Sequence, residues 1–188
     1  MTAPKNETLF SSVTLAALPT AVRLSRLMTA KAMRLWGLPG LIDDAGLVVS
    51  ELVTNAVQAT GTTEPKPSWE QLGPVAAIKV RVTHLGGSIS IAVWDNDPTP
   101  PASRDAAPDA EGGRGLMIVA ALSERWDYYP SAGGGKVVWA ELAIPPGMLG
   151  AAGLPRRVRS APVATVSRGD FIRDPGLLRR VHQGLKDL

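Results

Sequence analysis

Two runs of alternating apolar and polar residues constrain the fold of this chain more than any other feature. In residues 76–83 every second position from 78 is Ile or Val, and residues 88–94 repeat the pattern with Ile, Ile and Val. Successive side chains of a β-strand point to opposite faces, so each run has one apolar and one polar face. Residues 85–87, Leu-Gly-Gly, predict a tight hairpin between the runs. The apolar face of this hairpin needs a second layer to cover it.

Two amphipathic segments upstream are predicted to be helices of that layer. Residues 19–36 begin with Pro, which suits a first helical turn, and end before Gly37. Residues 41–59 begin near Asp43 and Asp44, which favour the positive N-terminal end of a helix. The expected buried stripe of the first helix is Val22, Leu24, Leu27, Met28, Ala32 and Leu35, opposite Arg23, Arg26, Lys31 and Arg34. The expected buried face of the second is Val48, Val49, Leu52, Val53, Ala56 and Val57.

The remaining elements complete a two-layer arrangement. Proline-rich segments 61–74 and 95–113 are expected to be loops, the second long enough for a lid or a binding loop. Strands are predicted at 9–18, 127–130 and 136–144, and a third helix at 115–126. This order of elements indicates the α+β class, with a two-layer α/β sandwich. Its sheet is expected to be mixed but mostly antiparallel, with helices on one face.

Composition and charge divide the chain of 188 residues in two. Residues 1–150 hold 12 Lys and Arg against 14 Asp and Glu, whereas residues 151–188 hold 8 against 3. We therefore expect one domain over 1–147 and a basic extension over 148–188, in which leucine spacing favours a short helix at 174–186. Cysteine is absent, which excludes disulfides and thiolate chemistry. No secretory signal or membrane span is recognisable, so a cytoplasmic protein without a membrane anchor is expected.

The first chemically informative cluster is Glu51 and Asn55. Their i, i+4 spacing places both on one face of the second predicted helix. Such a pair is often only a polar helix face, but this one borders the apolar residues of that helix, where polar groups are costly unless they are used. The carboxylate can act as a base, and the amide oxygen is a ligand type that Mg²⁺ prefers.

Two further clusters flank the second proline-rich segment. Asp95 directly follows an apolar strand, where it can form a turn or accept a hydrogen bond from an exocyclic amine. Gly112, Gly113 and Gly115 precede or open the third helix, with Arg114 adding positive charge. Glycines at a helix N-terminus let the backbone N–H groups approach a phosphate.

In this order, the three clusters resemble the Bergerat-type ATP-binding fold of the GHKL group, which includes gyrase and histidine kinases. The sequence SELVTNAV at 50–57 is similar to the N-box, and GGRGLMIV at 112–119 to the second glycine box. GGKVVWAEL at 134–142 is similar to the closing hairpin. The closest resemblance is to anti-sigma-factor serine/threonine kinases and to the small actinomycete ATP-binding regulatory proteins, over residues 9–146.

The resemblance implies a role for each site residue. Asn55 would ligate Mg²⁺, Glu51 would be the catalytic base, and Asp95 would bind the adenine amino group. Gly113, Arg114 and Gly115 would meet the ATP phosphates, with residues 97–112 as a lid.

The resemblance also implies a cytoplasmic regulator that binds Mg²⁺ and ATP and acts by partner switching. It would hold a sigma factor or phosphorylate a serine on an anti-anti-sigma-like protein, and it could form a homodimer. Residues 95–101 lack the family's glycines, and Glu111 stands where kinases tend to carry a basic residue. These departures leave an alternative open, a catalytically inactive and nucleotide-degenerate interaction module. The lack of a recognition motif argues against nucleic acid as a partner.

Overall fold

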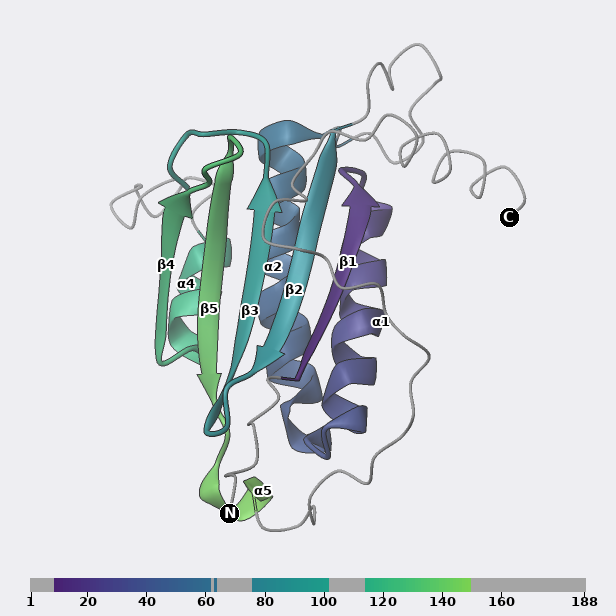
Figure 1. Ribbon diagram of the computed structural model, residues 1–188, viewed down its shortest axis with the longest axis vertical. Coiled ribbons are helices and arrows are strands. Elements are labelled where there is room, and N and C mark those ends of the chain that lie inside the picture. The colour runs from purple at the N-terminus through teal and green to yellow at the C-terminus, as the bar shows by residue number, and fades with distance from the viewer. Residues whose placement is uncertain (1–8, 62, 64–75, 102–113, 150–188) are drawn as a thin grey trace, which may run out of the picture.

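A five-stranded antiparallel sheet forms one layer of the protein (Figure 1). The computed structural model describes residues 9–61, 63, 76–101 and 114–149. The strand order is β1-β2-β3-β5-β4, and all four pairings within the described ranges are antiparallel. The strands are β1 (Phe10–Ala16), β2 (Ala77–His84), β3 (Ser88–Asp95), β4 (Arg125–Pro130) and β5 (Lys136–Ala143).

The helices form the second layer, and Figure 1 shows them behind the sheet. The long helices are α1 (Thr20–Leu35) and α2 (Ile42–Thr60), and α4 (Arg114–Leu122) lies beside α2. Two short elements, η1 (Pro39–Leu41) and α5 (Pro146–Leu149), were not predicted from the sequence. The predicted α+β sandwich, with helices on one face of the sheet, is confirmed.

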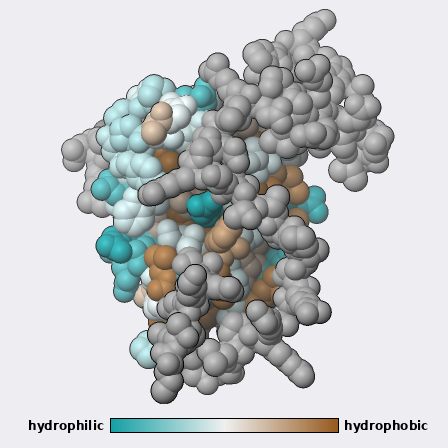
Figure 2. Space-filling view, viewed as in Figure 1, coloured by the Kyte–Doolittle hydropathy of each residue, from teal (hydrophilic) through white to brown (hydrophobic). Residues whose placement is uncertain are grey.

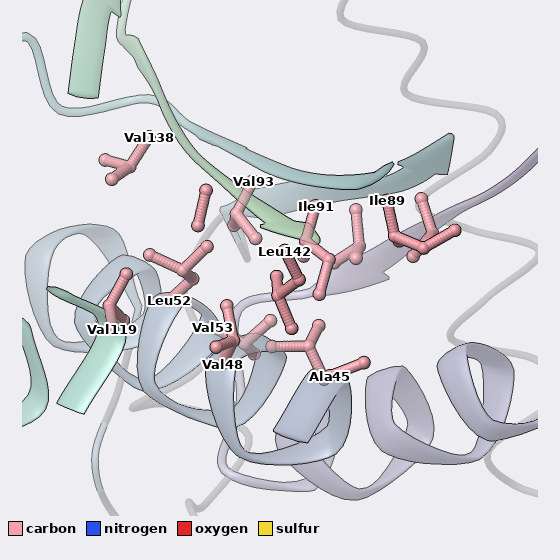
Figure 3. Packing of buried hydrophobic residues seen from close by; sticks show 14 of the residues in the cluster. Ala45, Val48, Leu52, Val53, Ile89, Ile91, Val93, Val119, Val138 and Leu142 are labelled. Carbon is pink, nitrogen blue, oxygen red and sulfur yellow. The ribbon is translucent and has the colours of Figure 1, made fainter. Parts of the chain in front are cut away.

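The core lies between α2 and the sheet (Figure 3). The alternation in β2 and β3 has the predicted effect, because Val80 pairs with Val93 and Val82 with Ile91 on the helix side. Val48 and Val53 of α2 meet these strands and are fully buried. The residues labelled in the figure come from four elements: Ala45, Val48, Leu52, Val53, Ile89, Ile91, Val93, Val119, Val138 and Leu142.

Half of the predicted buried stripe of α1 is wrong: Ala32 is buried and Val22 and Met28 pack against the core, but the three leucines do not. Leu24, Leu27 and Leu35 are exposed at 47%, 58% and 63%. The buried residues of this helix are Ala21, Ser25, Thr29, Ala32 and Met33. Small side chains let a helix backbone approach its neighbours closely, and the Ser25 hydroxyl is satisfied within the helix by the carbonyl oxygen of Ala21 at 2.8 Å. Close packing of mostly small residues therefore leaves Leu24, Leu27 and Leu35 towards solvent, whereas Met33 is buried.

The predicted helix at 115–126 is also too long. Helix α4 ends at Leu122, and β4 begins at Arg125. The Glu124 N–H donates to the carbonyl oxygen of Glu141 at 2.8 Å, and Trp126 pairs with Ala140. Pairing with β5 therefore overrides the helical pattern over the last residues of the predicted helix.

The face of the sheet opposite the helices carries tryptophans and basic side chains. The Lys79 ammonium lies 5.5 Å from the ring centroid of Trp94, and the Arg125 guanidinium lies 5.7 Å from that of Trp139. Figure 2 shows this side, where hydrophilic and hydrophobic surfaces adjoin. Trp94 and Trp139 are thus strand-face residues.

No helix within the described ranges is long and apolar enough to cross a membrane. Several sequence predictions lie outside the described residues: most of the loop at 61–74, Glu111, Gly112 and Gly113, and the extension after 149. Of the predicted lid over 97–112, only residues 97–101 are described.

Candidate functional site

Four segments bring the candidate site residues to one end of the sandwich, the upper end in Figure 1. Helix α2 runs upward to this end, β3 finishes there, and α4 and β5 begin there. Sheet pairing accounts for part of this convergence. An antiparallel sheet places the end of β3 beside the start of β5, and Asp95 is paired with Lys136.

The start of α4 lies directly against Glu51 and Asn55. A Cβ atom added to Gly115 would lie 2.7 Å from Glu51 Oε2 and 3.7 Å from Asn55 Oδ1. Glu51 and Asn55 are both partly buried, whereas their neighbours Leu52 and Val53 point into the core. The structure therefore brings Gly115 next to Glu51 and Asn55, although the sequence placed Gly115 in a separate cluster.

The first turn of α4 provides backbone N–H groups at this point. The first N–H groups of a helix have no partner within it, and the helix dipole makes this end positive. Gly115 keeps the turn free of a side chain on the side of Glu51 and Asn55. An anion could therefore meet the helix backbone close to both oxygen-bearing side chains. Arg114 is the first residue of α4, but its side chain lies outside the described part.

Asp95 is buried at the end of β3, with 1% of its surface exposed. Its Oδ1 accepts the backbone N–H of Asp97 at 2.9 Å and the Lys136 ammonium at 3.0 Å. The first bond closes a local turn, which agrees with the turn interpretation of Asp95. The other interpretation, acceptance of a hydrogen bond from an exocyclic amine, stays a prediction. Burial raises the pKa of Asp95 above its ordinary value, and the hydrogen bond and charge of Lys136 oppose this rise.

Lys136 is the site residue that the sequence analysis missed. It is buried, and its Nζ also lies 3.0 Å from the carbonyl oxygen of Asp97 and 3.4 Å from Asp97 Oδ2. Gly135 makes this approach possible, because its φ is +73° and a Cβ there would overlap the carbonyl oxygen of Asp95. The available signal was the start of a strand directly after three glycines, facing an acid across the sheet.

The side chains at this end fit magnesium and a nucleotide. Within the described ranges, no group of three His, Cys, Asp or Glu residues could hold a metal by itself. Asn55 offers an uncharged oxygen, which suits a Mg²⁺ ion that keeps waters and is shared with phosphates. The lack of a side chain at Gly115 lets the α4 backbone approach a phosphate, and the buried Asp95 carboxylate suits a hydrogen-bond donor of a base.

Comparison with protein families agrees with this geometry. The family model described as "Histidine kinase-like ATPase domain" matches residues 15–142, from β1 to β5. The chain therefore belongs to the histidine kinase-like ATPase family and is a GHKL-type ATP-binding domain. A search of curated proteins finds no match.

Proposed function

We propose that this protein is a cytoplasmic, ATP-binding regulatory protein that acts as an anti-sigma-factor-type serine/threonine kinase by partner switching. The observation that carries the proposal is the close approach of Gly115, at the start of α4, to Glu51 and Asn55. A helix N-terminus, a carboxylate and an amide oxygen at one point are the groups that phosphoryl transfer needs. The family match over residues 15–142 supports the ATP-binding part of the proposal.

Each residue has a distinct role in this proposal. Asp95 accepts a hydrogen bond from the amino group of adenine, and Gly115 opens the α4 backbone to the phosphates. For Gly113 and Arg114 we keep the phosphate-binding role that the resemblance implies. Asn55 ligates Mg²⁺, which, when bound with ATP, neutralises charge that develops on the transferred phosphoryl group. Glu51 accepts the proton of the attacking serine hydroxyl. The serine oxygen then bonds to the γ-phosphorus, and ADP departs.

The proposed partners are a sigma factor and an anti-anti-sigma-like protein. Helix α1 supports a protein partner, because its exposed Leu24, Leu27 and Leu35 leave an apolar surface uncovered in the described part of the chain. Beside them, a groove of about 440 Å³ between α1 and α2 is lined in part by Arg23 and Arg26. This surface suits a partner segment with apolar and acidic side chains. A homodimer through the same helix is an additional proposal.

One observation favours the alternative, an interaction module without kinase turnover. Asp95, the residue proposed for base recognition, already accepts two internal hydrogen bonds. If these bonds prevent base recognition, the chain would keep the fold and its partner surface without binding nucleotide.

Calorimetric titration with ATP and Mg²⁺ tests the ATP-binding part. We expect saturable binding by the wild-type chain and none by Asn55→Ala. Asp44→Ala is the matched control, because it removes an exposed oxygen-bearing side chain from the other end of α2. Absence of wild-type binding would favour the interaction module.

Phosphotransfer to candidate serine-bearing antagonists tests the kinase part. Glu51→Gln keeps the size of the side chain but removes the base, so we expect it to bind ATP and to lose phosphotransfer. Phosphotransfer at the wild-type rate in this variant would exclude Glu51 as the base.

A further inference from the structure

The buried pair of Asp95 and Lys136 lies where the proposed function places base recognition. The two side chains are 2% and 5% exposed, and their charged atoms are 3.0 Å apart. An isolated buried carboxylate takes up a proton rather than keep its charge in an apolar environment. The charge of Asp95 therefore depends on what surrounds it.

Lys136 uses its hydrogen-bonding capacity within this corner of the fold. An ammonium group has three donors. Its three neighbours here are Asp95 Oδ1, the carbonyl oxygen of Asp97 and Asp97 Oδ2. Lys136 thus has no spare donor for a ligand, and its hydrogen bonds all go to Asp95 and Asp97.

The bonds to Asp95 leave its two oxygens unequal. Oδ1 accepts both the Lys136 ammonium and the Asp97 N–H. Within the described ranges, no hydrogen bond reaches Oδ2. Oδ2 is therefore the oxygen free to accept a hydrogen bond from a ligand.

The charged groups that act on Asp95 are few in the described part of the chain. They are Lys136 from β5, which favours the charged form, and Asp97 from the segment after β3, which opposes it. The acid on the α2 face that borders α4, Glu51, lies against Gly115. Lys79 of β2 lies over the Trp94 ring, on the uncovered face of the sheet.

We propose that Lys136 is a positioning residue that sets base specificity, by keeping Asp95 ionised and by occupying Oδ1 so that Oδ2 receives an exocyclic amino group. The proposal rests on ATP binding by this site. An ionised Asp95 has no proton to donate, so it rejects a purine that presents a carbonyl oxygen at the same position. A protonated Asp95 would tolerate that purine, because its carboxyl O–H could donate a hydrogen bond to the carbonyl oxygen.

Nucleotide preference as a function of pH tests the proposal. The full-length wild-type chain, Lys136→Met, Lys136→Arg and Lys79→Met are titrated with ATP and with inosine triphosphate, each with Mg²⁺, from about pH 5.5 to about pH 8. We expect the wild type to prefer ATP by about tenfold or more throughout. In Lys136→Met the preference should weaken as the pH falls and then turn towards inosine triphosphate.

The other two variants separate charge from packing. Lys136→Arg keeps the charge and should keep the preference for ATP. Lys79→Met removes a lysine from the opposite face of the same sheet and should behave as the wild type. A Lys136→Met protein that retains the wild-type preference at every pH overturns the proposal.

Two further measurements decide the proposal even if nucleotide binding or folding fails. Without nucleotide, carbon-13 NMR titration of the Asp95 carboxyl should give a higher midpoint in Lys136→Met than in the wild type, and equal midpoints refute the charge effect.

If Lys136→Met does not fold at neutral pH, the double variant Lys136→Met/Asp95→Asn should fold, because it buries no unpaired charge. Failure of both variants to fold equally would make Lys136 a packing residue only. Absence of ATP binding by the wild type would instead refute the proposed function, independently of the NMR result.

Discussion

Replacement of Gly115 by Ala separates the stability of the fold from the chemistry of the site. The added methyl group would lie 2.7 Å from Glu51 Oε2, closer than Cβ atoms approach other heavy atoms. The atom it meets is the end of a flexible, partly buried side chain, which can rotate away. In a helix, Ala is favoured over Gly by up to about 1 kcal/mol. We therefore expect the free energy of unfolding to change by less than about 1 kcal/mol.

The same replacement should strongly reduce phosphotransfer. Displacement of a catalytic group by about 1 Å can lower a rate by about a hundredfold. We expect a loss of that order together with weaker ATP binding, because the methyl group also stands on the turn of α4 proposed to meet the phosphates. Phosphotransfer assays, calorimetric titration and urea unfolding measure the three quantities.

Gly46→Ala is the matched control for this prediction. Gly46 also lies in a helix, and the nearest atom to an added Cβ is Arg26 Nε at 4.0 Å. We expect a gain of about 0.5–1 kcal/mol in stability and unchanged ATP binding. The reasoning is refuted if Gly115→Ala retains wild-type activity and affinity, or if it unfolds the protein while Gly46→Ala does not.

Three further predictions concern other parts of the molecule. Gly135→Ala should destabilise the fold by more than about 2 kcal/mol in urea unfolding, whereas Gly86→Ala, which has a positive φ but open space around it, should cost only about 1–2 kcal/mol. Leu27→Ser should change stability by less than about 0.5 kcal/mol because the side chain is exposed, but it should weaken partner binding in a pull-down titration. Ser88 and Arg125 hold the pKa of Glu141 below its ordinary value of 4.5. Glu141 therefore contributes stability above that pH that is lost as the pH falls through the lowered value, and Glu141→Gln should remove this loss in pH-dependent thermal unfolding.

Local periodicity was sufficient to predict most elements and part of the site. The alternation in β2 and β3 specified both strands and their buried faces. The spacing of Glu51 and Asn55 specified a shared helix face, because helix geometry alone brings positions i and i+4 together. Both predictions depend on residues close in sequence, where the period of the element determines side-chain direction.

Predictions that depend on tertiary packing were the ones that failed. The apolar residues of α1 gave a credible stripe, yet Leu27 is exposed and Ser25 is buried, because close contact between elements favoured small side chains. The residues before Trp126 have a helical pattern, but Arg125 and Trp126 form strand β4 because they pair with β5. Lys136 could not be assigned to the site because its partner Asp95 is 41 residues away and the pairing depends on sheet register.

The two ends of the candidate site depend on different physical interactions. This difference decides which substitutions could remove phosphotransfer without removing the proposed partner binding. At the phosphate end, Gly115 gives α4 a close approach to the partly buried Glu51 and Asn55, whose side chains can adjust. At the base end, Asp95 and Lys136 are buried charges. Removal of Lys136 leaves Asp95 without its cation, and removal of Asp95 leaves Lys136 only the more distant Asp97 carboxylate. A substitution at Glu51 should therefore abolish the proposed phosphotransfer while the fold and the α1 surface persist. Loss of one member of the Asp95–Lys136 pair should affect folding and base recognition together. An interaction module is thus more readily derived from a kinase of this fold by changes at α2 than by changes at β3 or β5.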